Sequence, residues 1–176
     1  YVAAVLAKDE ALMDVFRSGG NFHSNIAHRV FRLPCEAEEV AELYPMQRQA
    51  AKAVTFGIMY GAGANKISQQ VTTDSGKPFS RGEAQEVIDD YFKSFHKLKA
   101  WLEKNQKSIE VNGFIYSYFG RKRRLPNVAS EDKGIKSHSI RSGLNFLVQS
   151  PASDINLLGG IDMSEYIRVN KMGARI

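Results

Sequence analysis

Apolar side chains recur every three or four residues along most of the chain, which is the periodicity of helices with one buried face. Glycine, proline and residues typical of helix caps divide this pattern into segments. We predict helices over residues 2–16, 21–31, 35–43, 46–60, 65–71, 81–95, 98–111 and 133–162. The predicted fold class is therefore mainly α.

Residues at the ends of these segments support the boundaries. Asn21 or Ser24 can cap the second helix. Pro45 suits the first turn of the fourth helix, where its missing N–H costs little. Ser80 with Glu83 has the spacing of a capping box.

The pattern changes in residues 113–120, which are rich in aromatic, β-prone side chains. Such a run favours a strand, and Gly120 suits a turn, so we predict one small β ribbon. A run of four cations, residues 121–124, follows it. We expect Tyr116 and Tyr118 to be packing residues.

Four residues of the segment 46–60 are spaced by four. Successive members turn by about 40° on a helix, so all four lie on one stripe, opposite an apolar face. The stripe consists of Arg48, Lys52, Phe56 and Tyr60, and the apolar face of Ala50, Ala51, Val54 and Ile58.

Two cations followed by two aromatic rings suit a nucleoside triphosphate. Arg48 offers a planar fork to phosphate oxygens, and Lys52 offers a compact charge. An aromatic ring one turn further along can support a base or a sugar. The alternative is an amphipathic helix whose charged face is solvated. The rings of Phe56 and Tyr60 count against it, because large apolar groups are uncommon on such a face.

A second stripe with the same spacing lies in the segment 133–162. It consists of Arg141, Asn145 and Gln149, while Ile140, Leu144 and Leu147 fall on another face. Arginine and side-chain amides can address the acceptors that every base pair offers in the DNA minor groove. Such contacts test the shape of a base pair rather than its identity.

A net charge of +5 and a sequence pI of about 9.3 favour an anionic partner without identifying it. The single cysteine, Cys35, excludes a disulfide within the chain and a cysteine metal site, and we interpret it as a small apolar residue. No run approaches the length of a membrane span.

The first stripe and the glycine after it, Arg48-x-x-x-Lys52-x-x-x-Phe56-x-x-x-Tyr60-Gly61, resemble motif B of family A (Pol I-like) DNA polymerases. The resemblance implies that Arg48 and Lys52 contact the triphosphate of the incoming dNTP and assist catalysis. It implies that Phe56 packs beside the sugar, where Phe goes with discrimination against dideoxynucleotides. Tyr60 and Gly61 would lie where the templating base enters.

Two further segments resemble the same family. His23 resembles the His of an Asp-Ile-His segment that reaches the triphosphate, although the Arg that follows it in the family is Ser24 here. Residues 119–126 resemble a Gly-Arg-Arg-Arg-x-x-Pro segment beside the DNA. The DNA contacts that this implies are Arg121, Lys122 and Arg123.

The family's palm helix turns an Arg, an Asn and a Gln towards the primer-template, which implies DNA contacts by Arg141, Asn145 and Gln149. A Gln-Gly-Thr-Ala-Ala-Asp run of the family departs here at Ser150 and Pro151. Pro151 also predicts a kink, because it removes a backbone hydrogen bond.

The resemblance covers nearly the whole chain. It implies the fingers subdomain of a right-hand polymerase, with a small β ribbon and a long palm helix. Residues 1–112 would form the fingers-like helical region, and residues 113–176 the ribbon and part of the palm helix. The implied partners are template-primer DNA, dNTPs and the rest of the polymerase chain, with no membrane. The implied location is the cytoplasm of a bacterial cell or of a host infected by a phage, which could itself be the source.

The parent enzyme would transfer dNMP to a primer 3′-OH by two-metal catalysis, with Mg²⁺ held by two aspartates. By the resemblance, one aspartate belongs to a motif that ends at Tyr1 and the other to a motif beyond Ile176. The chain itself would then supply no metal ligand, and we expect it to be inactive alone. The flanking palm, thumb and exonuclease regions would also lie outside it.

The residues alone leave two other functions open. One is a non-catalytic helical module that binds nucleic acid and needs no nucleotide selectivity. The other is a helical domain with a basic surface and no nucleic-acid role, which predicts no salt-dependent binding to DNA.

Overall fold

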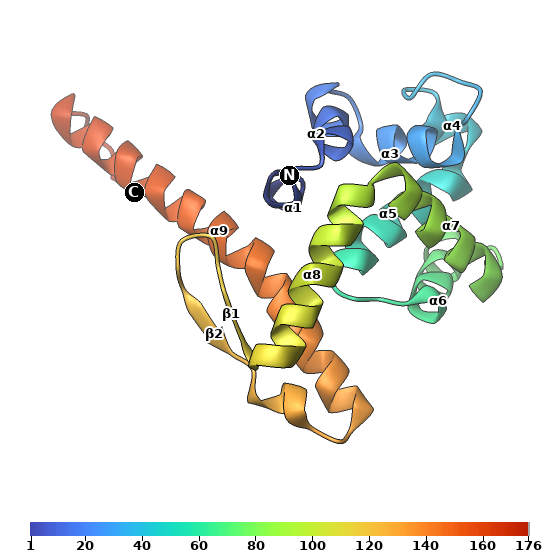
Figure 1. Cartoon of the computed structure of the whole chain (residues 1–176). Coiled ribbons are helices and arrows are strands. Elements are labelled where there is room, and N and C mark those ends of the chain that lie inside the picture. The colour runs from blue at the N-terminus through green and yellow to red at the C-terminus, as the bar shows by residue number, and fades with distance from the viewer. Residues whose placement is uncertain (176) are drawn as a thin grey trace. The chain divides into compact units, whose positions relative to one another are not determined.

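The computed structural model describes residues 1–175, which form helices and one two-stranded sheet (Figure 1). The helices are α1 (Val2–Ala7), α2 (Glu10–Arg17), α3 (Phe22–Phe31), α4 (Val40–Leu43), α5 (Pro45–Met59), α6 (Ala64–Ser75), α7 (Arg81–Ser94), α8 (His96–Asn112) and α9 (Lys133–Val169). Between α8 and α9 lie the strands β1 (Phe114–Tyr116) and β2 (Lys122–Arg124) and a 3₁₀ turn, η1 (Pro126–Ala129). The mainly α fold class is confirmed.

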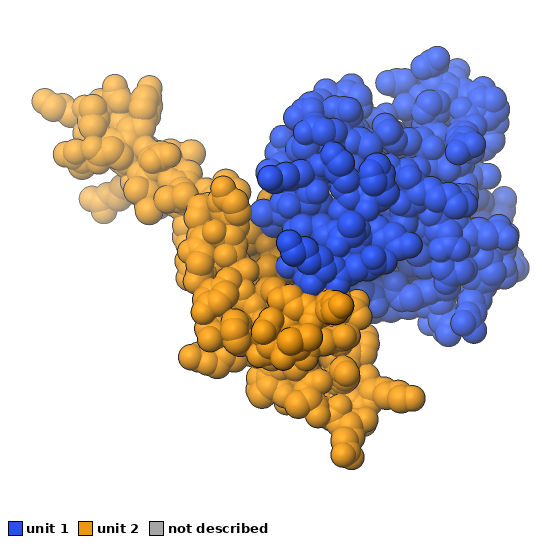
Figure 2. Space-filling view, in the orientation of Figure 1, with its two compact units in different colours: residues 1, 3–105 blue, residues 2, 106–176 orange. Residues whose placement is uncertain are grey.

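The chain forms two compact units (Figure 2). Unit 1 contains Tyr1 and residues 3–105, and unit 2 contains Val2 and the residues from 106 onward. The predicted division at residue 112 concerns the subdomains of a polymerase and stays a prediction.

Helix α5 is the centre of unit 1, where it packs against α3, α4, α6 and α7. The face of α5 that the sequence predicts to be apolar is buried, and it consists of Ala50, Ala51, Val54 and Ile58. Three of the helices that pack against α5 also bury aliphatic side chains, such as Ile26 of α3, Ile67 of α6 and Val87 of α7. Burial of this face leaves the stripe with Arg48 at the surface of the packed helices.

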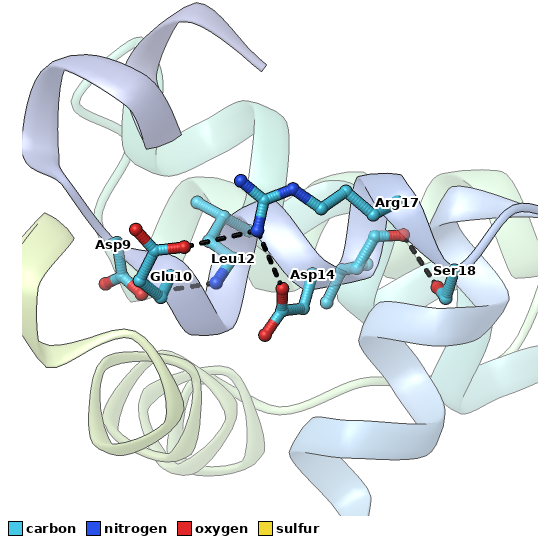
Figure 3. Close-up of polar contacts among 7 residues, drawn as sticks. Asp9, Glu10, Leu12, Asp14, Arg17 and Ser18 are labelled. Carbon is cyan, nitrogen blue, oxygen red and sulfur yellow. Dashed lines mark hydrogen bonds and ion pairs between the residues drawn. The ribbon is translucent and has the colours of Figure 1, made fainter.

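The predicted single helix over residues 2–16 is wrong, because the helix is interrupted between α1 and α2. Lys8 ends α1 in a left-handed conformation with φ of 52°. Asp9 caps α2 by accepting the N–H of Leu12 at 3.2 Å (Figure 3). Its other carboxylate oxygen accepts the N–H of Leu98 at 2.9 Å. Leu98 lies in the first turn of α8, where N–H groups have no partner within the helix, so Asp9 completes the start of two helices.

Two predicted caps are confirmed. The Asn21 side chain accepts the N–H groups of His23 and Ser24 at the start of α3. At the start of α7, Ser80 and Glu83 make both hydrogen bonds of a capping box.

Two further predicted helices of unit 1 have other bounds. The segment 35–43 is helical only in α4, because residues 36–39 close a separate turn in which the Glu39 N–H donates to the Glu36 carbonyl at 3.1 Å. The helix predicted over residues 65–71 continues to Ser75, where Gly76 ends it with φ of 68°.

In unit 2, β1 and β2 pair antiparallel, with Phe114 opposite Arg124 and Tyr116 opposite Lys122. Three of the four cations that we expected after the ribbon, residues 122–124, therefore form its second strand. Strands alternate their side chains between two faces. The ribbon buries Ile115 on one face and leaves Tyr116 53% exposed on the other. The expectation that Tyr116 is a packing residue is wrong for this reason, and Tyr118 in the turn is 73% exposed.

Helix α9 extends over 37 residues and ends seven residues beyond the predicted limit of 162. Its predicted apolar side chains, Ile140, Leu144 and Leu147, are buried. The helix continues through Pro151, and the kink predicted there stays a prediction.

We expect alanine at Gly143 to destabilise unit 2. A Cβ at this buried position of α9 would lie 2.6 Å from Leu125 Cδ1 and 2.7 Å from Ile109 Cδ1. Overpacking of this kind costs about 1–3 kcal/mol. The control is Gly159→Ala on the same helix, where a Cβ meets nothing within 4 Å and alanine favours the helix. In urea unfolding of the 176-residue chain, Gly143→Ala should be the less stable of the two variants. Equal stability would contradict the close packing.

Candidate functional site

Helix α5 begins at Pro45 and ends at Met59, and both ends have a local cause. Proline at the first turn needs no hydrogen-bond acceptor for its nitrogen. After the helix, Gly61 adopts a left-handed conformation with φ of 65°, and the Ala62 N–H donates to the Gly57 carbonyl at 2.7 Å. Tyr60 and Gly61 therefore lie directly where the helix stops.

The start of α3 brings His23 next to the stripe on α5. The imidazole ring of His23 lies 5.4 Å from the ring of Phe56, measured between centroids. Arg48 and Lys52 are close enough to act on the charge of His23. Of the predicted site residues, the structure thus brings together His23, Arg48, Lys52 and Phe56, and we refer to these four as the α3–α5 cluster.

The α3–α5 cluster has the electrostatics of an anion site. Burial lowers the pKa of His23, and the positive charges of Arg48 and Lys52 lower it further. The neutral imidazole is therefore favoured, and an anion that offsets the two cations would favour protonation again. Two buried atoms, His23 Nδ1 and Arg48 Nε, have no hydrogen-bond partner among residues 1–175. Each of these atoms can carry an N–H and can therefore donate to an acceptor oxygen.

A pocket of about 350 Å³ lies on the other side of the stripe, between α5 and α6. Gly57 permits the close approach of these helices, since a Cβ there would lie 3.1 Å from Ile67 Cγ1. The rings of Phe56 and Tyr60 are about half exposed, at 51% and 50%. The pocket is lined by Lys52, Ala53, Phe56 and Gly57 of α5, by Tyr60 and Ala62 just after that helix, and by Lys66, Ile67, Gln70 and Asp74 of α6.

Sequence reasoning missed the α6 side of this pocket. Lys66, Gln70 and Asp74 follow each other at a spacing of four, which was the signal that could have revealed a polar face. The Asp74 carboxylate accepts hydrogen bonds from Gln49 of α5 at 2.6 Å and from Gln70 at 2.7 Å. This carboxylate therefore joins the two helices at one end of the pocket.

In unit 2, three of the four consecutive cations are held by other side chains. Arg121 pairs with the buried Asp154 of α9. The ammonium group of Lys122 lies 3.9 Å from the ring centroid of Phe114. Arg123 donates to Ser142 Oγ at 2.7 Å, and its guanidinium lies over the ring of Phe146.

The polar stripe on α9 faces away from the buried side chains of that helix. Arg141 is half-buried and donates to Ser137 Oγ at 2.6 Å. Asn145 is half-buried as well, and Gln149 is exposed. The stripe thus offers amide and guanidinium groups at the surface of unit 2.

Among residues 1–175, no group of three or more His, Cys, Asp or Glu side chains is placed to hold a metal ion. Within the same range, no helix has the length and apolar character needed to cross a membrane.

Known proteins with similar sequences are polymerases. The chain is 46% identical over 184 residues to the DNA polymerase of Escherichia phage T5, covering 95% of this chain and 22% of that protein. It is 34% identical over 175 residues to the thermostable DNA polymerase I of Thermus aquaticus, covering 99% of this chain and 20% of that protein. The chain thus spans about a fifth of the length of these curated relatives.

A solved structure has the same fold. The POL domain of Pol1 from M. smegmatis, in complex with DNA primer-template and dNTP, superposes with a TM-score of 0.84 at 27% sequence identity. The match covers 99% of this chain and 29% of that one. Residues 1–176 also match DNA polymerase family A over their full length. The chain therefore belongs to DNA polymerase family A.

Proposed function

We propose that the chain is the part of a DNA polymerase that binds the incoming dNTP and positions the template-primer DNA. The observation that carries the proposal is the α3–α5 cluster, in which His23 Nδ1 and Arg48 Nε are buried without partners among the described residues. Buried polar atoms are normally hydrogen-bonded, so unpaired ones point to a ligand. A triphosphate has the acceptor oxygens and the negative charge that these atoms and Lys52 need.

Each member of the cluster has a distinct part in this proposal. Arg48 binds phosphate oxygens through its fork, and Lys52 acts as a compact charge on the leaving pyrophosphate. His23 gains a proton as the anion approaches and donates to it. The ring of Phe56 packs against the sugar, and Tyr60 with Gly61 borders the templating base at the end of α5.

The cations and amides of unit 2 would contact the DNA. The ribbon offers Arg121, Lys122 and Arg123 to phosphates, a contact that does not depend on sequence. The stripe of Arg141, Asn145 and Gln149 would follow the minor groove of the nascent base pairs. The M. smegmatis POL domain was solved with both DNA primer-template and dNTP, which supports the same two classes of partner.

Mg²⁺ ions held by aspartates in the rest of the polymerase chain would supply the charge that two-metal transfer of dNMP to a primer 3′-OH requires. Since the relatives are polymerases of bacteria and of a phage, we expect this nucleotide transfer to take place in the cytoplasm of a bacterial cell or of a phage-infected host. Residues 1–176 alone should then extend no primer.

A chimera tests the proposal. The chain would replace the corresponding segment of the phage T5 polymerase, to which it is 46% identical. We expect the chimera to extend a primer with Mg²⁺ and dNTPs, and the 176-residue chain to extend none. A folded but inactive chimera beside an active T5 polymerase would count against the proposal, and primer extension by the chain alone would contradict the need for outside metal ligands.

In the same chimera, Phe56→Tyr should improve the use of dideoxynucleotides relative to dNTPs. The added hydroxyl can make a hydrogen bond in place of the one that the missing 3′-OH would make. One such bond contributes about 0.5–1.5 kcal/mol, so the selectivity ratio should shift by roughly two- to thirteenfold. The measurement is the ratio of kcat/KM for the two substrates, with Phe92→Tyr on α7 as control. An unchanged ratio would contradict the proposed position of Phe56 beside the sugar.

A further inference from the structure

We propose that Asp154 is a positioning residue that orients Arg121 towards the DNA while cancelling its charge. This inference rests on the proposed contact between the β ribbon and DNA phosphates. It gives Arg121 a role different from that of the neighbouring cations, which the four-cation run in the sequence does not distinguish.

The ion pair has a buried and an open side. Arg121 Nε donates to Asp154 Oδ1 at 3.1 Å, and Arg121 Nη2 donates to the same oxygen at 2.5 Å. The Asp154 side chain is 11% exposed, whereas that of Arg121 is 61% exposed. The carboxylate is therefore enclosed by protein, and the guanidinium is the part of the pair that an outside anion can reach.

The backbone of Arg121 is also fixed. Its N–H donates to Oγ of the buried Ser117 at 3.2 Å, and its carbonyl accepts the Ser117 N–H at 2.9 Å. Gly120 closes the turn by donating to the Ser117 carbonyl at 3.0 Å. The turn thus holds the backbone of Arg121, and the Asp154 carboxylate holds its guanidinium, so the side chain is restricted at both ends.

Arg121 keeps donors for a second acceptor. A guanidinium has five N–H bonds, and a carboxylate held through Nε and Nη2 uses about two of them. The remaining N–H bonds belong to Nη1 and to the outer side of Nη2. A phosphate can therefore bind Arg121 without displacing Asp154.

The pair differs from its neighbours in charge. Lys122 lies over the neutral ring of Phe114, and Arg123 is held by Ser142 and Phe146, which are neutral too. Among the described residues, Arg121 is the member of the 121–124 run that has an acidic partner. Counterion release from DNA follows the charge that a protein brings to the phosphates. We therefore expect Lys122 and Arg123 to contribute to salt-dependent affinity, and Arg121 to contribute mainly geometry.

The test is the salt dependence of primer-template binding by the chimera, measured by fluorescence anisotropy without dNTP. Lys122→Gln and Arg123→Gln should each reduce the slope of log K against log salt concentration by about 0.9. The double variant Arg121→Gln with Asp154→Asn, which removes both charges of the pair, should change it by much less. Asp154→Asn should steepen the slope by up to about 0.9, so that affinity falls roughly three- to fourfold more for a fourfold rise in salt.

The variants separate this role from a structural one. If Asp154 only holds the ribbon on α9, Asp154→Asn should weaken binding at every salt concentration and leave the slope unchanged, which would overturn the inference. A slope reduced as strongly by the double variant Arg121→Gln with Asp154→Asn as by Arg123→Gln would overturn it too, because the charge of Arg121 would then not be cancelled. Asp154→Glu keeps the charge and should keep the slope of the unmodified chimera. Arg121→Gln alone leaves the Asp154 carboxylate without its partner, so its slope should be shallower than that of the double variant.

The same data keep the two proposals apart. If none of Lys122→Gln, Arg123→Gln and Arg121→Gln alters the slope, the ribbon does not contact DNA, and the proposed function of this region fails together with the inference. If Lys122→Gln and Arg123→Gln act as expected but Asp154→Asn does not, the DNA contact stands and the role of Asp154 is overturned.

Discussion

Alanine at Arg48 or at Lys52 should lower kcat/KM for dNTP incorporation by the chimera about 100- to 1000-fold, the usual effect of removing one preorganised donor from a developing charge. Both side chains belong to the α3–α5 cluster, where the positive charge of each lowers the pKa of His23. An anion bound beside His23 would therefore interact with both charges. The loss should appear in kcat where the contact strengthens as pyrophosphate leaves, and in KM where the contact is equally strong in the bound substrate. Single-turnover primer extension at several dNTP concentrations separates the two.

The matched control for Lys52→Ala is Lys104→Ala, on the exposed surface of α8, which should leave incorporation unchanged. Arg48→Lys keeps the charge but loses the fork, so it should recover only part of the activity. Primer-template affinity should stay the same in all four variants. A comparable loss of DNA binding in Arg48→Ala and Lys52→Ala would instead favour a module that binds nucleic acid without selecting nucleotides.

Replacement of Asp9 by alanine should destabilise unit 1 by about 1.5–5 kcal/mol. The loss of a helix N-cap accounts for about 0.5–2 kcal/mol of this. A buried N–H without an acceptor costs about 1–3 kcal/mol more, and the N–H of Leu98 would be left in that state. Urea unfolding of the 176-residue chain, followed by circular dichroism, measures the difference.

Asp14→Ala is the control for Asp9→Ala, because its carboxylate is exposed and contacts only Arg17 among the described residues (Figure 3). An exposed pair of this kind contributes about 0–1 kcal/mol. Asp9→Asn keeps one acceptor oxygen and turns an amide towards the other N–H, so its stability should be intermediate. Equal stability of Asp9→Ala and Asp14→Ala would show that the two helix starts do not depend on Asp9.

The sequence predicts most helices of this fold because their signals are local. The apolar face of α5 and the capping box at Ser80 depend on residues within one or two turns, and both are confirmed. The break at Lys8 escapes such reasoning, since the apolar spacing runs on across it and the second partner of Asp9 is Leu98. Strand β2 escapes it as well, because its cations have little β propensity of their own and are held in place by pairing with β1.

The candidate site also combines features that local sequence patterns predict with features that depend on distant contacts. The stripe on α5 is evident from spacing by four, and the resemblance to the family's Asp-Ile-His segment adds His23, which the structure brings beside it. The partner of Arg121 could not be predicted, because Asp154 is 33 residues away in the sequence and nothing in its own surroundings marks it. Contacts between distant segments are set by packing, which a local pattern does not encode.

The bond between Asp9 and Leu98 also has a consequence for the order in which the protein is made. The two residues are 89 positions apart, so α1 and α2 are synthesised long before α8 exists. During that time one oxygen of Asp9 must remain hydrated, and the long loop that separates the residues has yet to close. Unit 1 can therefore finish folding on the ribosome only after more than half of the 176 residues have emerged, which leaves its amino-terminal helices exposed to chaperones and proteases until then.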